Sequence, residues 1–266
     1  MAVGVISKVF RILEAIEASP SGLALKSICD VTHLNKSTAH RFLKQLEREG
    51  YLIRAEGGKY LIGPKLSQMG ARADHRATLQ AVSRPILSEL WKSTRETVNL
   101  AILDQGSVLY VEVIESPHEF RLSSRVGSRR SLHGTALGKA LAAFLLETHR
   151  EQILGGLNFQ ALTPKTIMNL VQFRQELEKV KSQGYAVDDE ETTPGARCVS
   201  APILGADGEA VAAISVSGPV TRVGQEQVGA LGAAVVQAAK AISAAMGFNH
   251  EQLLAAEAPR KHLVGS

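Results

Sequence analysis

Polar side chains of several kinds share one face of a helix predicted to open at Asn35. At about 100° per residue, Ala39, Phe42, Leu43 and Leu46 fall on one side, while hydroxyl, imidazole, guanidinium and ammonium groups fall almost opposite. Such groups donate hydrogen bonds to base edges and bind phosphates. In an isolated helix this pattern would favour a merely solvated face. The position of this helix as the second of a short helix-turn-helix unit instead favours a helix in the major groove of DNA. The candidate contacts are Lys36, Ser37, Thr38, His40, Arg41, Lys44 and Arg48.

Two helices ahead of this one are expected to position it. The first has a single apolar stripe of Val5, Val9, Ile12, Leu13 and Ile16, and it stops at the breakers of residues 19–22. The second is short and turns Leu25, Ile28 and Cys29 inward. A tight connection then leads to Asn35, whose side chain can cap the third helix by accepting from the backbone N–H of Ser37 or Thr38.

A β-hairpin is predicted directly after the third helix, over residues 51–62. Gly57 and Gly58 supply the positive φ angles that a two-residue turn requires. Arg54 and Lys59 flank the tip, where they can reach phosphates. Three helices followed by such a hairpin predict a winged helix-turn-helix over residues 1–63.

The charge distribution supports a polyanion-binding module at the start of the chain. Residues 1–76 carry 12 Lys and Arg against 7 Asp and Glu, a net charge of +5. The other 190 residues carry 18 against 19, a net charge of −1. The basic excess therefore lies wholly in the first part of the chain, although charge alone also allows chance surface variation.

The larger second part has the pattern of an α+β domain, an antiparallel sheet with packed helices. A polar helix over about 65–77 serves as the linker (64–77), and the domain covers 78–250 before a tail at 251–266. Strands are predicted near 98–102, 108–114, 119–123, 196–204 and 209–217. Helices are predicted at about 79–94, kinked by Pro85, and at 135–146, 166–183 and 223–246.

Three sequence blocks in order resemble the IclR family of bacterial transcriptional regulators over nearly the whole chain. They are LNKSTAHRFLKQLEREGYL, SLHGTALGKA, and GYAVDDEE continuing through RCVSAP to AISVSGP. The resemblance implies a GAF-like sensor domain with a six-stranded antiparallel sheet, and a small carboxylate or aromatic metabolite as effector. It also implies homodimers, often paired into tetramers, that repress or activate catabolic genes from operator DNA.

By position, the resemblance places effector contacts on Leu122, Ala136, Leu137, Asp188, Ala196, Cys198, Ser215 and Ser217. The residues agree in part, because Ser215 and Ser217 alternate along a strand and point to one face. Backbone N–H groups opening the helix after His133 offer a second anion site. Asp188 either accepts from a ligand hydroxyl or caps its own turn, and Cys198 alone reads more simply as a small buried apolar residue.

Composition indicates an ordinary soluble protein of 266 residues, with 45% hydrophobic and 21% charged residues. No apolar run approaches the ~20 residues that cross a bilayer. Only two cysteines, Cys29 and Cys198, are present, which favours the reducing cytoplasm over a disulfide scaffold or zinc site. We expect a cytoplasmic protein that joins the nucleoid when bound to DNA, without cofactor or metal.

Two other functions fit the residues less well. For an enzyme, the Gly134 to Ala140 segment superficially resembles a phosphate-binding loop, but its glycine spacing is one residue short and it lacks the magnesium-binding hydroxyl. The acidic run 188–191 points in several directions with no histidine pair nearby, and His118 and His133 lack a nucleophile motif. A scaffold whose winged helix binds protein is disfavoured by the basic excess.

Overall fold

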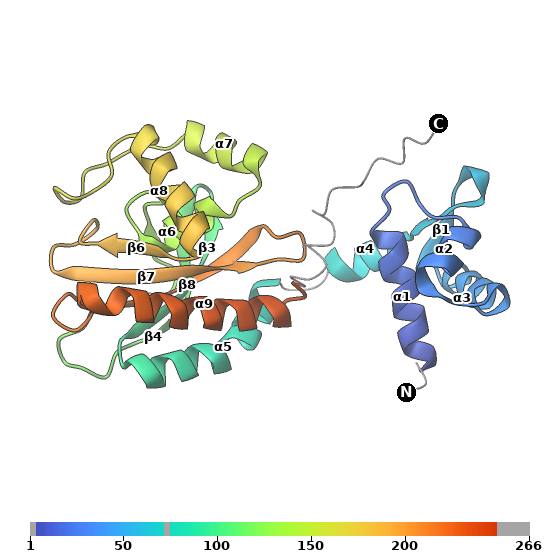
Figure 1. The fold of residues 1–266 in the computed structure, drawn as a ribbon, viewed down its shortest axis with the longest axis horizontal. Coiled ribbons are helices and arrows are strands. Elements are labelled where there is room, and N and C mark those ends of the chain that lie inside the picture. Colours follow the sequence, from blue (N-terminus) through green and yellow to red (C-terminus); the bar gives the residue numbers. More distant parts are fainter. Residues whose placement is uncertain (1–3, 72–74, 249–266) are drawn as a thin grey trace, which may run out of the picture. The chain divides into compact units, whose positions relative to one another are not determined.

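The computed structural model describes residues 4–71 and 75–248. The chain divides into two compact units, residues 1–75 and 76–266, each with its own hydrophobic core (Figure 1). The predicted linker, 64–77, runs across this division and includes residues outside the described part. The predicted tail, 251–266, also lies outside it.

Unit 1 is a helical bundle with a small antiparallel hairpin. Its described elements are α1 (Val5–Glu17), α2 (Leu25–Thr32), α3 (Lys36–Arg48), β1 (Leu52–Arg54), η1 (Glu56–Gly58), β2 (Tyr60–Ile62) and α4 (Pro64–Ala71). The core gathers residues from α1, α2, α3 and both strands: Ile12, Ile16, Ile28, Leu34, Ala39, Leu43, Leu52 and Tyr60. The predicted stripe of α1 holds only over its second half, since Val5 is 62% exposed.

The hairpin turn is longer than the predicted two-residue turn. Gly57 and Gly58 do adopt positive φ angles of 78° and 72°. However, the loop runs from Ala55 to Lys59, whose backbones are joined by a 2.8 Å hydrogen bond, and it contains one turn of 3-10 helix. Two adjacent glycines satisfy the dihedral angles of either turn, so they do not determine its length.

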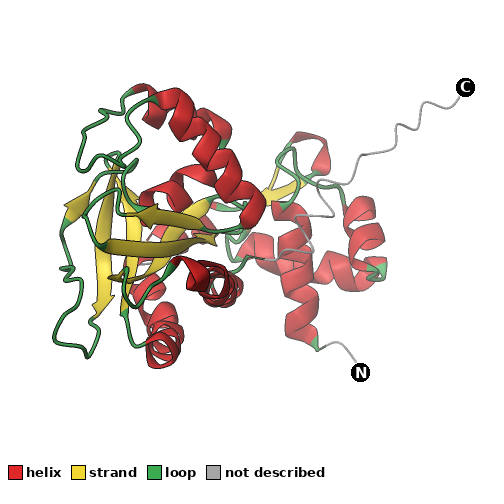
Figure 2. Ribbon diagram, turned by 60° about the vertical axis from the view of Figure 1, so that its left-hand side comes forward, coloured by secondary structure: helices red, strands yellow, loops and turns green. Residues whose placement is uncertain are grey.

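Unit 2 is built on a six-stranded antiparallel sheet (Figure 2). Its strands are β3 (Thr97–Asp104), β4 (Ser107–Ile114), β5 (Arg129–Arg130), β6 (Ala186–Asp189), β7 (Ala196–Leu204) and β8 (Ala210–Pro219), in the order β5-β4-β3-β8-β7-β6. Its helical elements are α5 (His75–Thr94), α6 (Ala136–Ala143), α7 (Glu147–Gly155), α8 (Leu170–Gln183), η2 (Gln225–Gln227) and α9 (Val228–Ala245).

The sheet has a separate core on each face. Helices α6 and α8 pack with one face, around residues such as Ala101, Ala140 and Phe173. Helices α5 and α9 pack with the other, around residues such as Leu87 and Ile214 (Figure 1). Both faces of the sheet are therefore buried. Polar residues on the face that packs with α6 are unusual in such a core and are candidates for a functional site.

One helical stretch contradicts the expectation that no segment approaches membrane-spanning length. Residues Gln225–Ala245 are long and apolar enough by length and composition. Alanines and valines make up most of α9, but Gln237, Lys240 and Ser243 interrupt them, so the stretch is not a continuous apolar run. In the structure α9 packs on the sheet and buries Val235, Ala239 and Ile242, as a core helix does.

Three predictions for the strands and helices of unit 2 are wrong. No strand forms over 119–123; this segment is a loop whose carbonyls accept side-chain hydrogen bonds, Leu122 from Thr97 and Phe120 from Arg222, and the strand is β5 instead. The predicted helix 135–146 ends at Ala143 and is followed by a separate α7. Helix α8 begins at Leu170 because Asn169 caps it, accepting from the Gln172 N–H at 2.9 Å.

Candidate nucleic-acid interface and ligand cavity

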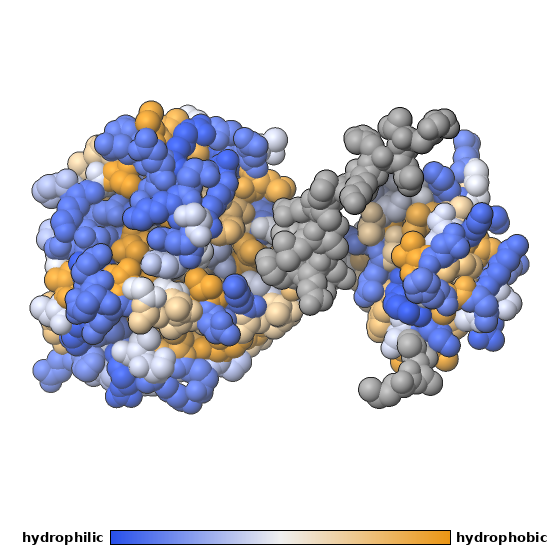
Figure 3. Space-filling model, in the orientation of Figure 1, coloured by the Kyte–Doolittle hydropathy of each residue, from blue (hydrophilic) through white to orange (hydrophobic). Residues whose placement is uncertain are grey.

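Helix α3 presents the polar face that its periodicity predicts. Ala39 and Leu43 are fully buried, and the side chains opposite them are exposed: Lys36, Ser37, His40, Arg41, Lys44 and Arg48. Hydrophilic side chains cover the part of unit 1 where α3 lies (Figure 3). Thr38 differs, because it is half-buried and its backbone N–H serves the cap of the helix.

The start of α3 is fixed by two local features. His33 takes a left-handed conformation (φ 55°) that ends α2 and turns the chain sharply. Asn35 then caps α3, its Oδ1 accepting from the Thr38 N–H at 2.9 Å and from the Ser37 hydroxyl at 3.0 Å. These contacts hold the N-terminal turn of α3, from which a recognition helix reaches base edges.

The hairpin places its two predicted cations at either end of its loop. Arg54 and Lys59 are both exposed. The Arg54 guanidinium lies 5.7 Å from the centre of the Tyr60 ring, a cation–π contact that restrains the side chain. The geometry is that of a small wing hairpin with two exposed cations.

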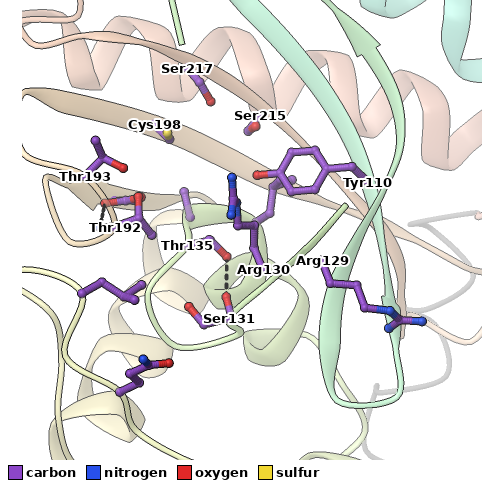
Figure 4. Close-up of a pocket in the computed structure, with 15 residues that line it drawn as sticks. Tyr110, Arg129, Arg130, Ser131, Thr135, Thr192, Thr193, Cys198, Ser215 and Ser217 are labelled. Carbon is purple, nitrogen blue, oxygen red and sulfur yellow. Dashed lines mark hydrogen bonds between the residues drawn. The ribbon is translucent and has the colours of Figure 1, made fainter. Parts of the chain in front are cut away.

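In unit 2, a cavity of about 320 Å³ lies on the face of the sheet that packs with α6 (Figure 4). The sheet register turns one polar residue of nearly every strand toward this face, since paired residues share a face. From one edge of the sheet to the other, these are Arg130, Tyr110, Asn99, Ser215 and Ser217, Cys198 and Asp188. All of them except Asn99 line the cavity directly.

Asn99 controls the hydrogen bonds of the two serines. It is fully buried, and its Nδ2 donates to Ser215 Oγ at 3.1 Å and Ser217 Oγ at 3.2 Å. Because each serine oxygen already accepts from Asn99, its own hydroxyl hydrogen is left to donate, from Ser215 into the cavity and from Ser217 to the cavity or to the neighbouring Cys198 sulfur. The centre of the cavity is therefore neutral and offers donors to an acceptor oxygen.

Asp188 closes the cavity at the β6 edge and caps the following turn. Its Oδ1 accepts from the backbone N–H groups of Glu191 (2.7 Å) and Thr192 (3.2 Å), and its Oδ2 accepts from the Thr192 hydroxyl at 2.6 Å. Burial raises the pKa of Asp188, against the lowering effects of these hydrogen bonds and of Lys139. Of the two alternatives from the sequence, turn capping is what the structure shows.

The rest of the acidic run 188–191 is also engaged in structure. Asp189 binds Arg197, Glu190 binds Lys165 at 2.7 Å, and Glu191 binds the buried Lys139. Lys139 also donates to the Val187 carbonyl at 2.8 Å. It therefore connects α6 both to strand β6 and to the turn that follows this strand. No group of three His, Cys, Asp or Glu that could hold a metal occurs among the described residues.

Cys198 and Tyr110 face the cavity as neutral groups. Burial raises the pKa of the Cys198 thiol, and the nearby Asp188 raises it further. Burial likewise raises the pKa of Tyr110, with Cys198 and Asp188 adding to the effect. Cys198 is thus a half-buried cysteine without the thiolate character of a reactive one, and it forms no disulfide within the described part of the chain.

Six of the eight predicted effector residues line the cavity: Ala136, Leu137, Asp188, Cys198, Ser215 and Ser217. Leu122 and Ala196 do not; Leu122 lies in the loop after β4, and Ala196 is buried at the start of β7. Sequence reasoning missed other residues of the cavity, among them Tyr110, Arg130 and Thr192. Asn99 was detectable as a polar residue between Val98 and Leu100 on a buried strand.

A winged helix with a basic recognition face, joined to a unit with a polar cavity, defines a DNA-binding transcriptional regulator. The chain belongs to the IclR family. Residues 5–55 match the IclR helix-turn-helix domain, and residues 71–244 match the bacterial transcriptional regulator IclR C-terminal domain. This family consists of transcriptional regulators and not of enzymes, which removes the enzyme alternative.

Relatives match over nearly their full length. The chain is 33% identical to the HTH-type transcriptional regulator KdgR of Escherichia coli, over 93% of this chain and 94% of KdgR. The IclR crystal structure from Thermotoga maritima is similar with a TM-score of 0.62 at 30% identity, covering 91% and 98% of the two chains. An IclR homologue from Microbacterium hydrocarbonoxydans, complexed with 4-hydroxybenzoate, shares the fold at 24% identity and a TM-score of 0.59, with 91% and 99% coverage.

Proposed function

We propose that this protein binds an operator through α3 and the hairpin, and that a small organic acid in the unit 2 cavity changes its affinity for that operator. The observation that carries the proposal is that one chain contains both the exposed basic face of α3 and a cavity lined by hydrogen-bond donors. The roles of the individual residues on α3, the hairpin and the cavity wall belong to this proposal.

The cavity supports a small acid rather than a bulky ligand. At about 320 Å³ it lies near the lower limit of about 300 Å³ that is typical of ligand pockets. Its polar groups converge from several strands, which suits a ligand held by hydrogen bonds. The homologue that binds 4-hydroxybenzoate supplies a first probe of the right class.

The proposed complex is a homodimer in the cytoplasm, with pairing of dimers left to experiment. Two recognition helices would bind two half-sites about one helical turn apart, or a multiple of that. The effector acts only through its different affinities for the arrangement that binds DNA and the one that does not. Either repression or activation is compatible with this scheme.

Fluorescence anisotropy tests the proposal directly. The labelled DNA is the fragment upstream of the gene for this protein, with an unrelated fragment as the control, at several salt concentrations. Preferential binding that weakens with salt is expected, because cations on α3 and the hairpin release counterions from the phosphates. Equal binding to both fragments, or none at low salt, would refute sequence-specific recognition.

The effector half of the proposal has its own variants. Ser215→Ala and Ser217→Ala each remove one donor from the cavity and leave α3 untouched. We expect a weaker response to an effector and an unchanged affinity of the ligand-free protein for DNA. Loss of both activities to the same extent would assign these serines to folding instead.

A further inference from the structure

The charged groups of the cavity are arranged asymmetrically across the sheet. Two arginines come from β5 and one carboxylate, Asp188, comes from β6, at opposite edges of the sheet. Arg129 is neutralised by Asp104, to which it is bound through both the carboxylate and the backbone carbonyl. Arg130 makes no hydrogen bond or ion pair with any residue in 4–71 or 75–248, so it is an uncompensated cation at this edge.

The sheet register turns Arg130 toward the cavity. Arg130 pairs with Val108, which is buried in the core on the cavity side, whereas Arg129 pairs with Leu109 on the opposite side. Figure 4 shows the Arg130 guanidinium pointing among the lining residues toward Tyr110, and the Arg129 guanidinium pointing away. The positive charge of Arg130 also acts on the Tyr110 hydroxyl.

The β6 edge disfavours an anion. The three donors that bind the Asp188 oxygens match an ionised, acceptor-only carboxylate, and they leave it little capacity for a ligand. A ligand carboxylate beside Asp188 would meet like charge. The field across the cavity therefore draws an anionic group toward β5 and away from β6.

Between these edges lies the neutral donor group formed by Asn99, Ser215 and Ser217. Three strand spacings of about 4.8 Å, roughly 14 Å in total, separate β5 from β8. The Arg130 side chain covers part of this span. A two- or three-carbon acid, with C–C bonds of about 1.5 Å, does not cover the remainder.

We infer that Arg130 binds the carboxylate of the effector, and that the effector is an elongated monocarboxylate whose far end carries a hydroxyl or keto oxygen for Ser215 and Ser217. This inference rests on the proposed function and specifies the ligand class of its cavity. Arg130 then selects for the charged group, and the distance from β5 to β8 selects for length. Short acids reach only one of the two ends.

Calorimetric titration of the full-length protein tests the inference with three probes. They are 4-hydroxybenzoate, its uncharged amide 4-hydroxybenzamide, and the short acid lactate. The wild type is expected to bind 4-hydroxybenzoate most tightly. Arg130→Gln should weaken that binding roughly 10- to 100-fold, as expected for loss of a charge-assisted hydrogen bond, and should leave the binding of the amide unchanged.

Two matched variants separate binding from folding. Arg125→Gln removes a nearby exposed arginine that does not line the cavity, and should bind 4-hydroxybenzoate as the wild type does. Arg130→Lys retains the charge and should recover part of the lost affinity. Equal loss in Arg125→Gln and Arg130→Gln would assign the effect to the general positive charge of this segment and overturn the role of Arg130.

The inference fails if the wild type binds 4-hydroxybenzoate no better than 4-hydroxybenzamide or lactate at millimolar concentration. It also fails if Arg130→Gln weakens the acid and the amide equally. Failure of the proposed function is measured separately, as absent or unselective DNA binding by the ligand-free wild type. Arg130→Gln should bind DNA in that assay as the wild type does, because β5 belongs to unit 2.

Discussion

At the scale of single residues, Arg41 is the side chain of α3 best suited to read a base. It is exposed near the middle of the helix, and its guanidinium lies 5.3 Å from the centre of the Phe42 ring, which restrains it. We predict that Arg41→Ala weakens specific DNA binding by roughly 1–3 kcal/mol, the range for a bidentate base contact. Anisotropy with specific and unrelated DNA measures the difference.

The control for Arg41 is Arg84→Ala, which removes another exposed arginine, from α5 in unit 2. Its affinity for DNA should remain that of the wild type. If a folded Arg41→Ala variant retained full preference for the specific fragment, Arg41 would contribute nothing to base readout.

Asp188 gives a prediction about pH. Because burial raises its pKa, the native state holds the proton more tightly than the unfolded chain, whose aspartate titrates near its ordinary value of about 3.9. The free energy of unfolding therefore falls as pH rises from the unfolded-state pKa to the raised native pKa, because ionised Asp188 destabilises the native state. Asp188→Asn removes this cost, so the stability of the variant relative to the wild type should increase with pH across this range.

The neighbouring aspartate supplies a control of opposite sign. Partial burial acts to raise the pKa of Asp189, but Arg197 and Lys165 outweigh it and lower that pKa. The ionised Asp189 stabilises the native state above the ordinary pKa, and this contribution is lost as pH falls. The stability of Asp189→Asn relative to the wild type should therefore decrease as pH rises. Chemical denaturation of both variants at a series of pH values measures the slopes, and slopes of the same sign would contradict the assignment.

The positions of the candidate side chains could be predicted from the sequence where a local pattern dictates them. Ser215 and Ser217 alternate along a strand, and the periodicity of α3 separates its polar residues from Leu43. Arg130 was missed because its place in the cavity wall depends on pairing between β5 and β4, and its lack of a partner contrasts with Arg129 only once Arg129 is seen to bind Asp104. Neither fact is encoded near Arg130 in the chain.

At the scale of elements, the cap of α3 determines how its first turn is presented. Asn35 satisfies the Thr38 N–H, and Asn169 does the same for Gln172 at the start of α8. Asn35→Ala should destabilise unit 1 by about 1 kcal/mol. Hydrogen exchange of α3 amides should show faster opening, with weaker DNA binding as a consequence.

Asn169→Ala is the matched control for this cap. It breaks the same kind of contact in unit 2 and should leave exchange in α3 unchanged. Accelerated exchange throughout both units in Asn35→Ala, rather than in α3 and its neighbours, would show that the cap has no local role.

Helices and strands could be predicted best where the apolar residues recur with a clear helical or strand spacing. Helices α1 and α3 follow apolar stripes, whereas the segment 119–123 alternates like a strand but lies in a loop fixed by Thr97 and Arg222. Those partners are distant in sequence, so local propensity had no access to them. The break between α6 and α7 was hidden similarly, because both flanking segments favour helix.

At the scale of the whole molecule, the charge and the cavity are assigned to different units. The net charge of +5 over residues 1–76 accompanies the helix-turn-helix, and the cavity lies wholly in unit 2. Any influence of an effector on DNA must pass between units that have separate cores. Helix α4 is the described element of unit 1 nearest to that division along the chain, which makes it the candidate relay.

Linkage makes this relay testable in both directions. If an effector changes the affinity for DNA by some factor, DNA must change the affinity for the effector by the same factor. Ser67 lies exposed within α4, so Ser67→Pro disrupts the helix, at a cost of about 3 kcal/mol, without removing a buried contact. In this variant we expect the factor by which the effector changes DNA affinity, and the factor by which DNA changes effector affinity, both to approach a value of one. The affinity for the effector without DNA should stay constant. Titrations of effector with and without DNA, and of DNA with and without effector, measure the two factors. Unchanged factors in a folded Ser67→Pro variant would show that α4 does not couple the units.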